Sequence, residues 1–583
     1  MALAQAIRRS DAILVRIVWL ISILIFALQA LAWTHLVTGI RAMTPWPVRV
    51  VTLAWLVVCV IWLRAGMGRG GEFAGLSLLP RSWALRFAGF AYLFLLLNTL
   101  ISFPSGFDAI HYHLLLPLEW LRNGGVWPMD PDPLMAQPAN AELLSLPALS
   151  IHNEALVGLG NALGALILAI SVYSIALRFT ELIEAAEFSV ALVVGLPIIL
   201  YQTFSSYTDL FGTSMLFAAA ALFMAYCENG ERALCWASAV ALGLSFGTKP
   251  CFWPYCVLFF GVIAFVLWSR KAYALMTVSA ALLAIPALLW FARNEIATGN
   301  PLYPLAIHVG PIALNGLDRS NFVDPHGTGV LGPSLKALTY PWVEYVWDHG
   351  IPFDEHRGLG PAFATFWVPS LLVACIAAVQ VRRVAVLVAL FAVSWLVWWG
   401  PLYRVLRFGL PVIILMCLFG ALFYKRISTT SLRRPVGALL AAGTALGCLM
   451  CLTTPARDFV ERIRAHSWSR AVYYGYPDIV DQLPPGSRVL NRVPAASNFI
   501  LEGRNLTNVV VTLPESAKPA ALCDGESGYA VTMGDTGAQD AVLRTCASLL
   551  YDGVPRSIHP KITKEWRVYR YAAASQAAGH PKF

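Results

Sequence analysis

The chain has 583 residues, of which 58% are hydrophobic and 13% are charged, and its mean hydropathy is +0.64. This balance excludes an ordinary water-soluble globular protein, in which about 25% of residues are charged. The net charge of +9 does not indicate nucleic acid as a partner, since the basic excess of membrane proteins collects in cytoplasmic loops. The composition predicts an integral membrane protein.

The first predicted element is an apolar run over residues 12–33, which follows Arg8 and Arg9. This run is too long for the apolar segment of a typical signal peptide, so we expect a retained membrane span. A second span is predicted over residues 47–64. Residues 1–82 are therefore expected to form a region with two membrane helices.

Eleven more apolar stretches of spanning length follow, which gives about thirteen predicted spans. They lie at 83–103, 156–177, 188–204, 209–227, 233–248, 250–268, 272–292, 361–380, 384–400, 405–424 and 434–453. Lys and Arg residues fall in alternate loops, which predicts a cytoplasmic N-terminus and an extracytoplasmic C-terminus. The predicted orientation depends on the short loop at Lys249. If the two spans beside this loop were one span, every later loop would lie on the opposite side of the membrane.

Two predicted outer loops, residues 104–155 and 293–360, are long and rich in polar groups, as is typical of loops that carry function. In the first loop, residues 109–123 have the spacing of a helix that lies in the membrane interface. If this helix begins at Asp108, His111 and Tyr112 share a face with its carboxylate. A simple N-cap role for Asp108 is the alternative.

The segment GFDAIHYHLLLPLEW at 106–120 resembles the C-type integral-membrane glycosyltransferases, which use polyprenyl-phosphate sugars and include protein O-mannosyltransferases and lipid A aminoarabinose transferases. Five further short motifs follow in the order of that family. They are SYTDLFG at 206–212, GLSFGTKPCFWP at 243–254, RNEIATGNPLYP at 293–304, GLGP at 358–361 and YRVLRFGLP at 403–411. The resemblance implies an all-α polytopic membrane bundle whose transferase-like core covers residues 83–454.

In this family an Asp in the first outer loop is the catalytic acid/base element, and Asp108 matches its position, which implies a general base. Ala109 stands where the family often has a second acid, so metal dependence stays open. Should Mg²⁺ or Mn²⁺ bind, the expected ligands are Asp108, His111 and Asp209. His111 and Asp209 are also predicted to be catalytic, and for Asp209 capping of a helix N-terminus is the alternative.

Four basic residues, Lys249, Arg293, Arg404 and Arg407, are predicted to bind the donor and to stabilise the charge on its leaving phosphate. Their alternative is snorkelling toward lipid headgroups. The remaining predicted substrate contacts are Tyr112 and Glu142, and Glu142 belongs to an Asn-x-Glu element found in bacterial relatives.

The region from 455 to 583 contains the strand-length runs SRVLNRV, NVVVTL and GYAVTM, separated by Pro, Gly and Asn. It predicts a small soluble α/β domain outside the membrane. Cys523 and Cys546 lie in this domain and could pair in an oxidising compartment. The other nine cysteines have no metal-ligand spacing and are interpreted as packing residues.

The sequence thus predicts a glycosyltransferase that moves a sugar, with inversion, from a polyprenyl-phosphate donor to an acceptor hydroxyl. The acceptor is a lipid-linked glycan, lipid A, an envelope polysaccharide or a protein, and membrane lipids surround the chain. The expected location is the inner (plasma) membrane, with the C-terminal domain periplasmic if the cell is Gram-negative. Two alternatives stay open: a transporter or flippase for a lipid-linked precursor, and a non-catalytic membrane assembly subunit.

Overall fold

The structure is a computed structural model that describes most of the chain. The described residues are 2–68, 82–100, 103–104, 106–127, 134–309, 312–316, 358–399, 406–465, 469–493, 498–512, 527–534, 543–544, 546–555 and 565–571. They divide into two compact units. The helical unit comprises Met1–Leu97 and Glu119–Thr453, and the C-terminal unit comprises Asn98–Leu118 and Thr454–Phe583.

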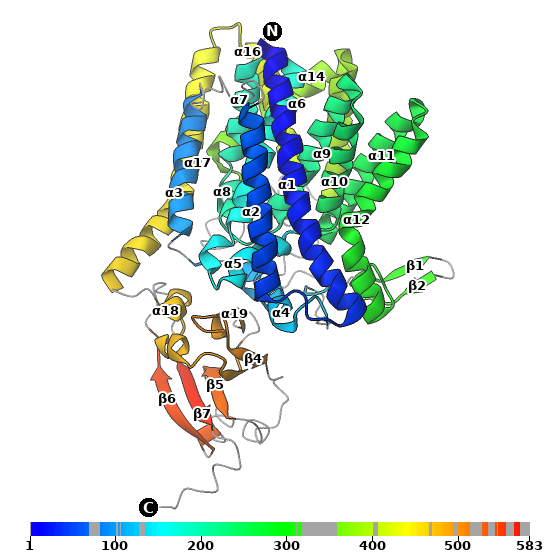
Figure 1. Ribbon diagram of the computed structural model, residues 1–583. Helices are drawn as coiled ribbons and strands as arrows, with labels where there is room; N and C mark the ends of the chain where they lie inside the picture. The colour runs from blue at the N-terminus through cyan, green and yellow to red at the C-terminus, as the bar shows by residue number, and fades with distance from the viewer. Residues whose placement is uncertain are drawn as a thin grey trace, which may run out of the picture. The chain divides into compact units, whose positions relative to one another are not determined.

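Long apolar helices make up the helical unit, and they run side by side in Figure 1. In chain order the helices are α1 (Ala2–Thr38), α2 (Pro45–Gly68), α3 (Trp83–Thr99), α4 (Leu115–Asn123), η2 (Glu142–Ser145), α5 (Leu146–Ser150), η3 (Glu154–Leu156), α6 (Leu159–Thr180), α7 (Ile183–Val194), α8 (Pro197–Thr203), α9 (Asp209–Asn229), α10 (Arg232–Phe246), η4 (Pro250–Phe252), α11 (Trp253–Ser269), α12 (Tyr273–Thr298), α14 (Gly360–Gln380), α15 (Arg382–Trp399), η6 (Leu406–Gly409), α16 (Leu410–Ile427) and α17 (Arg433–Ala465). A small antiparallel hairpin, β1 (Ile307–Val309) and β2 (Ile312–Leu314), follows α12.

The predicted membrane bundle is confirmed, and each of the thirteen predicted stretches contains a helix or, for 188–204, the pair α7 and α8. Nine helices in the described ranges are long and apolar enough to cross a membrane, and α7 with α8, bent by 69°, makes a tenth if the pair is one span. The shorter apolar helices α3 and α10 have 17 and 15 residues. At about 1.5 Å per residue they fall short of a hydrocarbon core about 30 Å thick.

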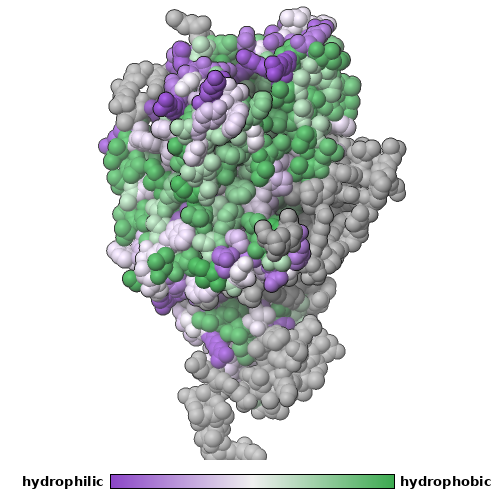
Figure 2. Space-filling view, turned by 90° about the vertical axis from the view of Figure 1, so that its right-hand side faces the viewer, coloured by the Kyte–Doolittle hydropathy of each residue, from purple (hydrophilic) through white to green (hydrophobic). Residues whose placement is uncertain are grey.

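Burial separates the inner helices of this unit from the outer ones. The apolar windows of α9 and α16 are each 83% buried, whereas that of α2 is 6% buried. Apolar residues cover most of the middle of the helical unit in Figure 2, and hydrophilic residues gather at its upper end. An apolar belt of this size would be unfavourable in water, so it identifies a multi-pass membrane protein.

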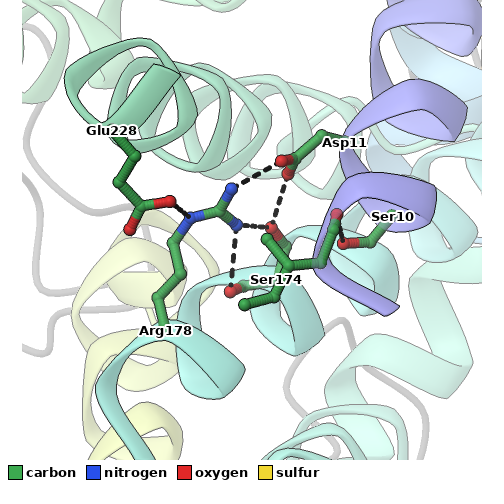
Figure 3. A network of polar contacts seen from close by, with 6 residues as sticks. Ser10, Asp11, Ser174, Arg178 and Glu228 are labelled. Atoms are coloured by element: carbon green, nitrogen blue, oxygen red, sulfur yellow. Dashed lines mark hydrogen bonds and ion pairs between the residues drawn. The ribbon is translucent and has the colours of Figure 1, made fainter. Parts of the chain in front are cut away.

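A buried ionic network joins α1 to the inner helices α6 and α9 (Figure 3). The Arg178 guanidinium on α6 lies 2.6 Å from the carboxylate of Asp11 on α1 and 3.0 Å from that of Glu228 on α9. The Ser174 hydroxyl donates a further hydrogen bond to Asp11, at 3.1 Å. We call these four residues the Arg178 network. It fixes the first helix to the centre of the bundle.

The C-terminal unit contains a five-stranded mixed sheet in the order β4-β3-β5-β7-β6. Its strands are β3 (Arg488–Asn491), β4 (Val509–Thr512), β5 (Gly528–Met533), β6 (Ala547–Gly553) and β7 (Trp566–Tyr571). Strand β3 is parallel to β4 and β5, and β7 is antiparallel to β5 and β6. Helices α18 (Arg470–Tyr474), η7 (Asp478–Gln482) and α19 (Asn498–Leu501) complete the unit. The three predicted strand runs correspond to β3, β4 and β5, which confirms the α/β domain.

Cys546 of this unit is disulfide-bonded. Cys523, its predicted partner, lies outside the described residues.

Residues 98–118 belong to the C-terminal unit although they precede it by more than 300 positions in the chain. The Tyr474 hydroxyl donates to the Pro104 carbonyl at 2.6 Å, and the ring of Phe103 lies 5.5 Å from that of Tyr473. Ile110, in the π-helical turn η1 (Ala109–His113), packs against the apolar core of the sheet domain. The predicted helix over 109–123 is thus two elements, η1 and α4.

Candidate functional site

Three charged residues predicted from separate motifs meet inside the helical unit. The Asp209 carboxylate lies 3.3 Å from the Lys249 ammonium and 3.7 Å from Nε of Arg407. All three residues are buried, with exposed fractions of 0%, 4% and 7%. We call them the cation cluster, because two cations face one carboxylate.

Each member of the cation cluster stands at the beginning of a predicted membrane span. Asp209 is the first residue of α9, Lys249 directly precedes η4 and α11, and Arg407 lies in η6 just before α16. Helix N-termini carry partial positive charge and unpaired N–H groups, which favour anions. The helix ends therefore add to the two cations, and the cluster is suited to hold a negatively charged group.

Aromatic rings pack against both cations of the cluster. The Lys249 ammonium lies 5.0 Å from the centre of the Phe408 ring, and the Arg407 guanidinium lies 5.1 Å from that of Tyr207. Such contacts hold a cation in a protein interior without neutralising it. Snorkelling is a poor account of Lys249 and Arg407, since their charged ends are buried by protein.

Glu142 is also buried, at 5% exposure, and it lines a small recess in the helical unit. The other polar residues that line this recess come from α6, from η2 and from the segment that leads into α9; they are Ser145, Asn161, Ser206, Tyr207 and Thr208. Tyr207 is thus shared between the recess and the cation cluster.

Asn140, which sequence reasoning did not select, fixes the segment that leads to Glu142. Its side-chain oxygen accepts hydrogen bonds from Gln29 on α1 and Trp290 on α12, both at 2.8 Å, and its backbone N–H donates to the Gly247 carbonyl. A Cβ atom at Gly247 would lie 2.3 Å from the Asn140 amide nitrogen, so the contact requires glycine. The Asn-x-Glu element is the sequence signal that could have identified Asn140.

Arg293 is buried and contacts backbone groups of the same segment. Its guanidinium donates to the carbonyls of Ala136 and Gln137, at 2.7 and 3.1 Å. These bonds make it a positioning residue for the chain before Glu142, and its contact with substrate stays a prediction. Arg404, the fourth predicted cation, lies outside the described residues.

Asp108 lies in the C-terminal unit and does not cap η1 through its side chain. Instead its carboxylate accepts a hydrogen bond from the Tyr112 hydroxyl at 3.0 Å. The His111 ring packs against Phe107, with the ring centres 5.1 Å apart. The predicted association of Asp108 with Tyr112 is therefore present, and the capping alternative is not.

The predicted metal ligands are divided between the two units, with Asp108 and His111 in one and Asp209 in the other. Within the described ranges, no three His, Cys, Asp or Glu side chains are grouped as a metal site would require. The metal site stays a prediction, and no step below is derived through a metal.

No family model and no curated protein matches the sequence. Solved structures do match: ArnT from Cupriavidus metallidurans in the apo state, with a TM-score of 0.56, and the same protein bound to undecaprenyl phosphate, with a TM-score of 0.55. The chain has the ArnT fold. Each comparison covers 86% of this chain and 99% of the ArnT chain, at 13% identity. The ArnT fold confirms the fold predicted from the C-type glycosyltransferase motifs.

Proposed function

We propose that this protein is a membrane glycosyltransferase that uses a polyprenyl-phosphate-linked sugar as donor. The observation that carries the proposal is the cation cluster, which gathers two buried cations and one carboxylate at the beginnings of three helices. That ArnT, which shares the fold, binds undecaprenyl phosphate supports the same class of ligand here.

In the proposed reaction, the acceptor oxygen bonds to the anomeric carbon while the bond from that carbon to the phosphate oxygen breaks. The departing polyprenyl phosphate gains negative charge, and Lys249 and Arg407 stabilise it in a site that excludes water. Asp209 is a positioning residue, since its carboxylate holds the two cations near each other. One displacement of this kind inverts the anomeric configuration.

Asp108 is the proposed general base, which takes the proton of the acceptor hydroxyl. The support for this role is its place in the GFDAIHYH motif and its hydrogen bond from Tyr112, which orients the carboxylate. The acceptor classes are those expected from the family: a lipid-linked glycan, lipid A, an envelope polysaccharide or a protein. The proposed location is the inner membrane with the C-terminal unit outside the cytoplasm.

Asp108→Asn tests the catalytic role. We expect sugar transfer in a reconstituted membrane to fall about 10²- to 10⁴-fold, the usual contribution of a general base, while undecaprenyl phosphate still binds. Asp478→Asn, at an exposed carboxylate of the same unit, is the matched control and should transfer at the wild-type rate. Full transfer by Asp108→Asn would contradict the assignment. Lipid movement across the membrane without a glycosylated product would favour the flippase alternative.

A further inference from the structure

Helix α17 is longer than a membrane span needs to be. It has 33 residues, Arg433–Ala465, so its length is about 50 Å at about 1.5 Å per residue. A hydrocarbon core about 30 Å thick requires only about 20 residues. A span that begins at Arg433 therefore leaves the core near residue 453, and the helix continues beyond it. We call residues 453–465 the α17 extension.

The helical bundle stops covering α17 where the extension begins. Residues on one face of the preceding turns are at most 3% exposed; they are Leu440, Thr444, Cys448 and Cys451. The Cys451 thiol also contacts the Pro197 carbonyl, at 3.5 Å. Among the later residues of this helix whose side chains the structure describes, none is buried. The described part of the protein thus leaves the extension uncovered.

The α17 extension has an apolar face. Phe459, Val460 and Ile463 are 38%, 42% and 49% exposed. Because consecutive residues of an α-helix are about 100° apart, these three residues fall within an arc of about 100°. Arg457 and Glu461 lie outside this arc, and residues 455–464 include three arginines and two acidic residues. The extension is therefore amphipathic, with basic residues in excess.

Lipid is the partner that fits this face. Three large apolar side chains on one exposed face are unfavourable in water. The extension continues a membrane span within the same helix, so its first turn begins at the bilayer surface. An amphipathic helix with a basic polar side lies in the plane of the interface, its apolar face about 5–10 Å into the headgroup boundary. Pro455 lacks a backbone N–H, so the helix can bend there.

We infer that the α17 extension lies in the lipid interface and anchors the C-terminal unit to the bilayer. Residues from Thr454 onward belong to that unit, and the extension precedes its helix α18. Asp108 belongs to the same unit. The anchor would keep the unit that carries the proposed base at the membrane surface. The inference does not depend on the proposed function, because it concerns contact with lipid and not sugar transfer.

The test places the photoreactive residue p-benzoylphenylalanine at one position at a time in the full-length protein, held in nanodiscs of phosphatidylcholine. Phe459 and Ile463 are the test positions, and Arg457 and Glu461 are the controls outside the apolar arc. Leu449, which is 59% exposed within the span, is the positive control. Illumination links the residue to the molecule beside it, and mass spectrometry of the intact protein identifies lipid adducts.

We expect positions 459 and 463 to form lipid adducts in a yield similar to that of position 449. Positions 457 and 461 should give a yield several-fold lower. None of the five side chains is buried, so each variant should fold as the wild type does.

Two kinds of result would overturn the inference. Equal yields at the test and control positions, or no adduct at Phe459 and Ile463 while Leu449 reacts, would show that the apolar face does not lie in lipid. Cross-links from Phe459 to protein in place of lipid would show that a second copy, or another part of this chain, covers the face.

Discussion

The helical unit contains two buried ionic clusters that are opposite in composition. In the Arg178 network one guanidinium meets two carboxylates, at 2.6 and 3.0 Å, and a serine adds a hydrogen bond. In the cation cluster two cations meet one carboxylate, at 3.3 and 3.7 Å. The first is tight and ties α1 to α6 and α9. The second is looser and has an excess of positive charge.

We interpret the Arg178 network as a structural contact between helices and the cation cluster as the proposed phosphate site. A buried charge is tolerated when its partners neutralise and hydrogen-bond it, as they do for Arg178. In the cation cluster two cations share the one carboxylate of Asp209, and the helix N-termini add positive charge. In the proposed function an anionic phosphate binds beside the two cations of the cation cluster, whereas Arg178 is held by two carboxylates of the protein itself.

The largest expected effect on stability is that of Arg178→Met. Removing the guanidinium leaves the Asp11 carboxylate buried, at 5% exposure for the residue, so the free energy of unfolding should fall by about 3–5 kcal/mol. Chemical unfolding in detergent measures this loss. Arg433→Met, at an exposed arginine near Glu184, should change stability by less than about 1 kcal/mol. Equal losses of stability in the two variants would show that the Arg178 network does not stabilise the contact of α1 with the bundle.

Asp209→Asn should destabilise the ligand-free protein by a smaller amount, about 2–3 kcal/mol, since aromatic rings still hold the two cations. Undecaprenyl phosphate at 100 times its Kd should raise the free energy of unfolding of this variant by about 2.7 kcal/mol. Thermal unfolding with and without the lipid measures both effects. Asp11→Asn leaves the cation cluster intact, so the lipid should stabilise this variant by the same amount. Failure of the lipid to stabilise either variant would show that the cation cluster does not hold the lipid phosphate.

The smallest expected effect is that of Gly247→Ala, which probes the support of Glu142 rather than either cluster. The added methyl group would meet the Asn140 amide at 2.3 Å and the Pro286 carbonyl at 2.8 Å, at a cost of about 1–3 kcal/mol. Gly261→Ala is the matched control, because a Cβ atom there meets nothing within 4 Å. A lower melting temperature for the Gly247 variant alone is the expected result, and equal melting temperatures would contradict it.

The sequence was sufficient to predict the members of the cation cluster because each begins an apolar run. Hydropathy locates where a span starts, and a charged residue is easily recognised at the start of an apolar run. Asp209, Lys249 and Arg407 each occupy such a position. Hydropathy does not show which helix ends lie next to one another, because this depends on how the helices pack. The bend of 69° between α7 and α8 is also invisible to hydropathy, since both halves are apolar.

Long-range contacts were beyond prediction for the same reason. Tyr474 and Pro104 are 370 positions apart, and neither carries a motif that would indicate their hydrogen bond. The recess beside Glu142 escaped prediction as well, because Ser206 and Thr208 are common residues, and the absence of a hydrogen-bond partner for their hydroxyls among the described residues is evident only from the structure.

The most direct test of the cation cluster as a phosphate site is the affinity of Arg407→Gln for undecaprenyl phosphate. Loss of a charge-assisted hydrogen bond predicts a Kd about 10- to 100-fold higher than that of the wild type. Arg433→Gln, the exposed control, should bind as the wild type does. An unchanged Kd in a folded Arg407→Gln protein would contradict the account.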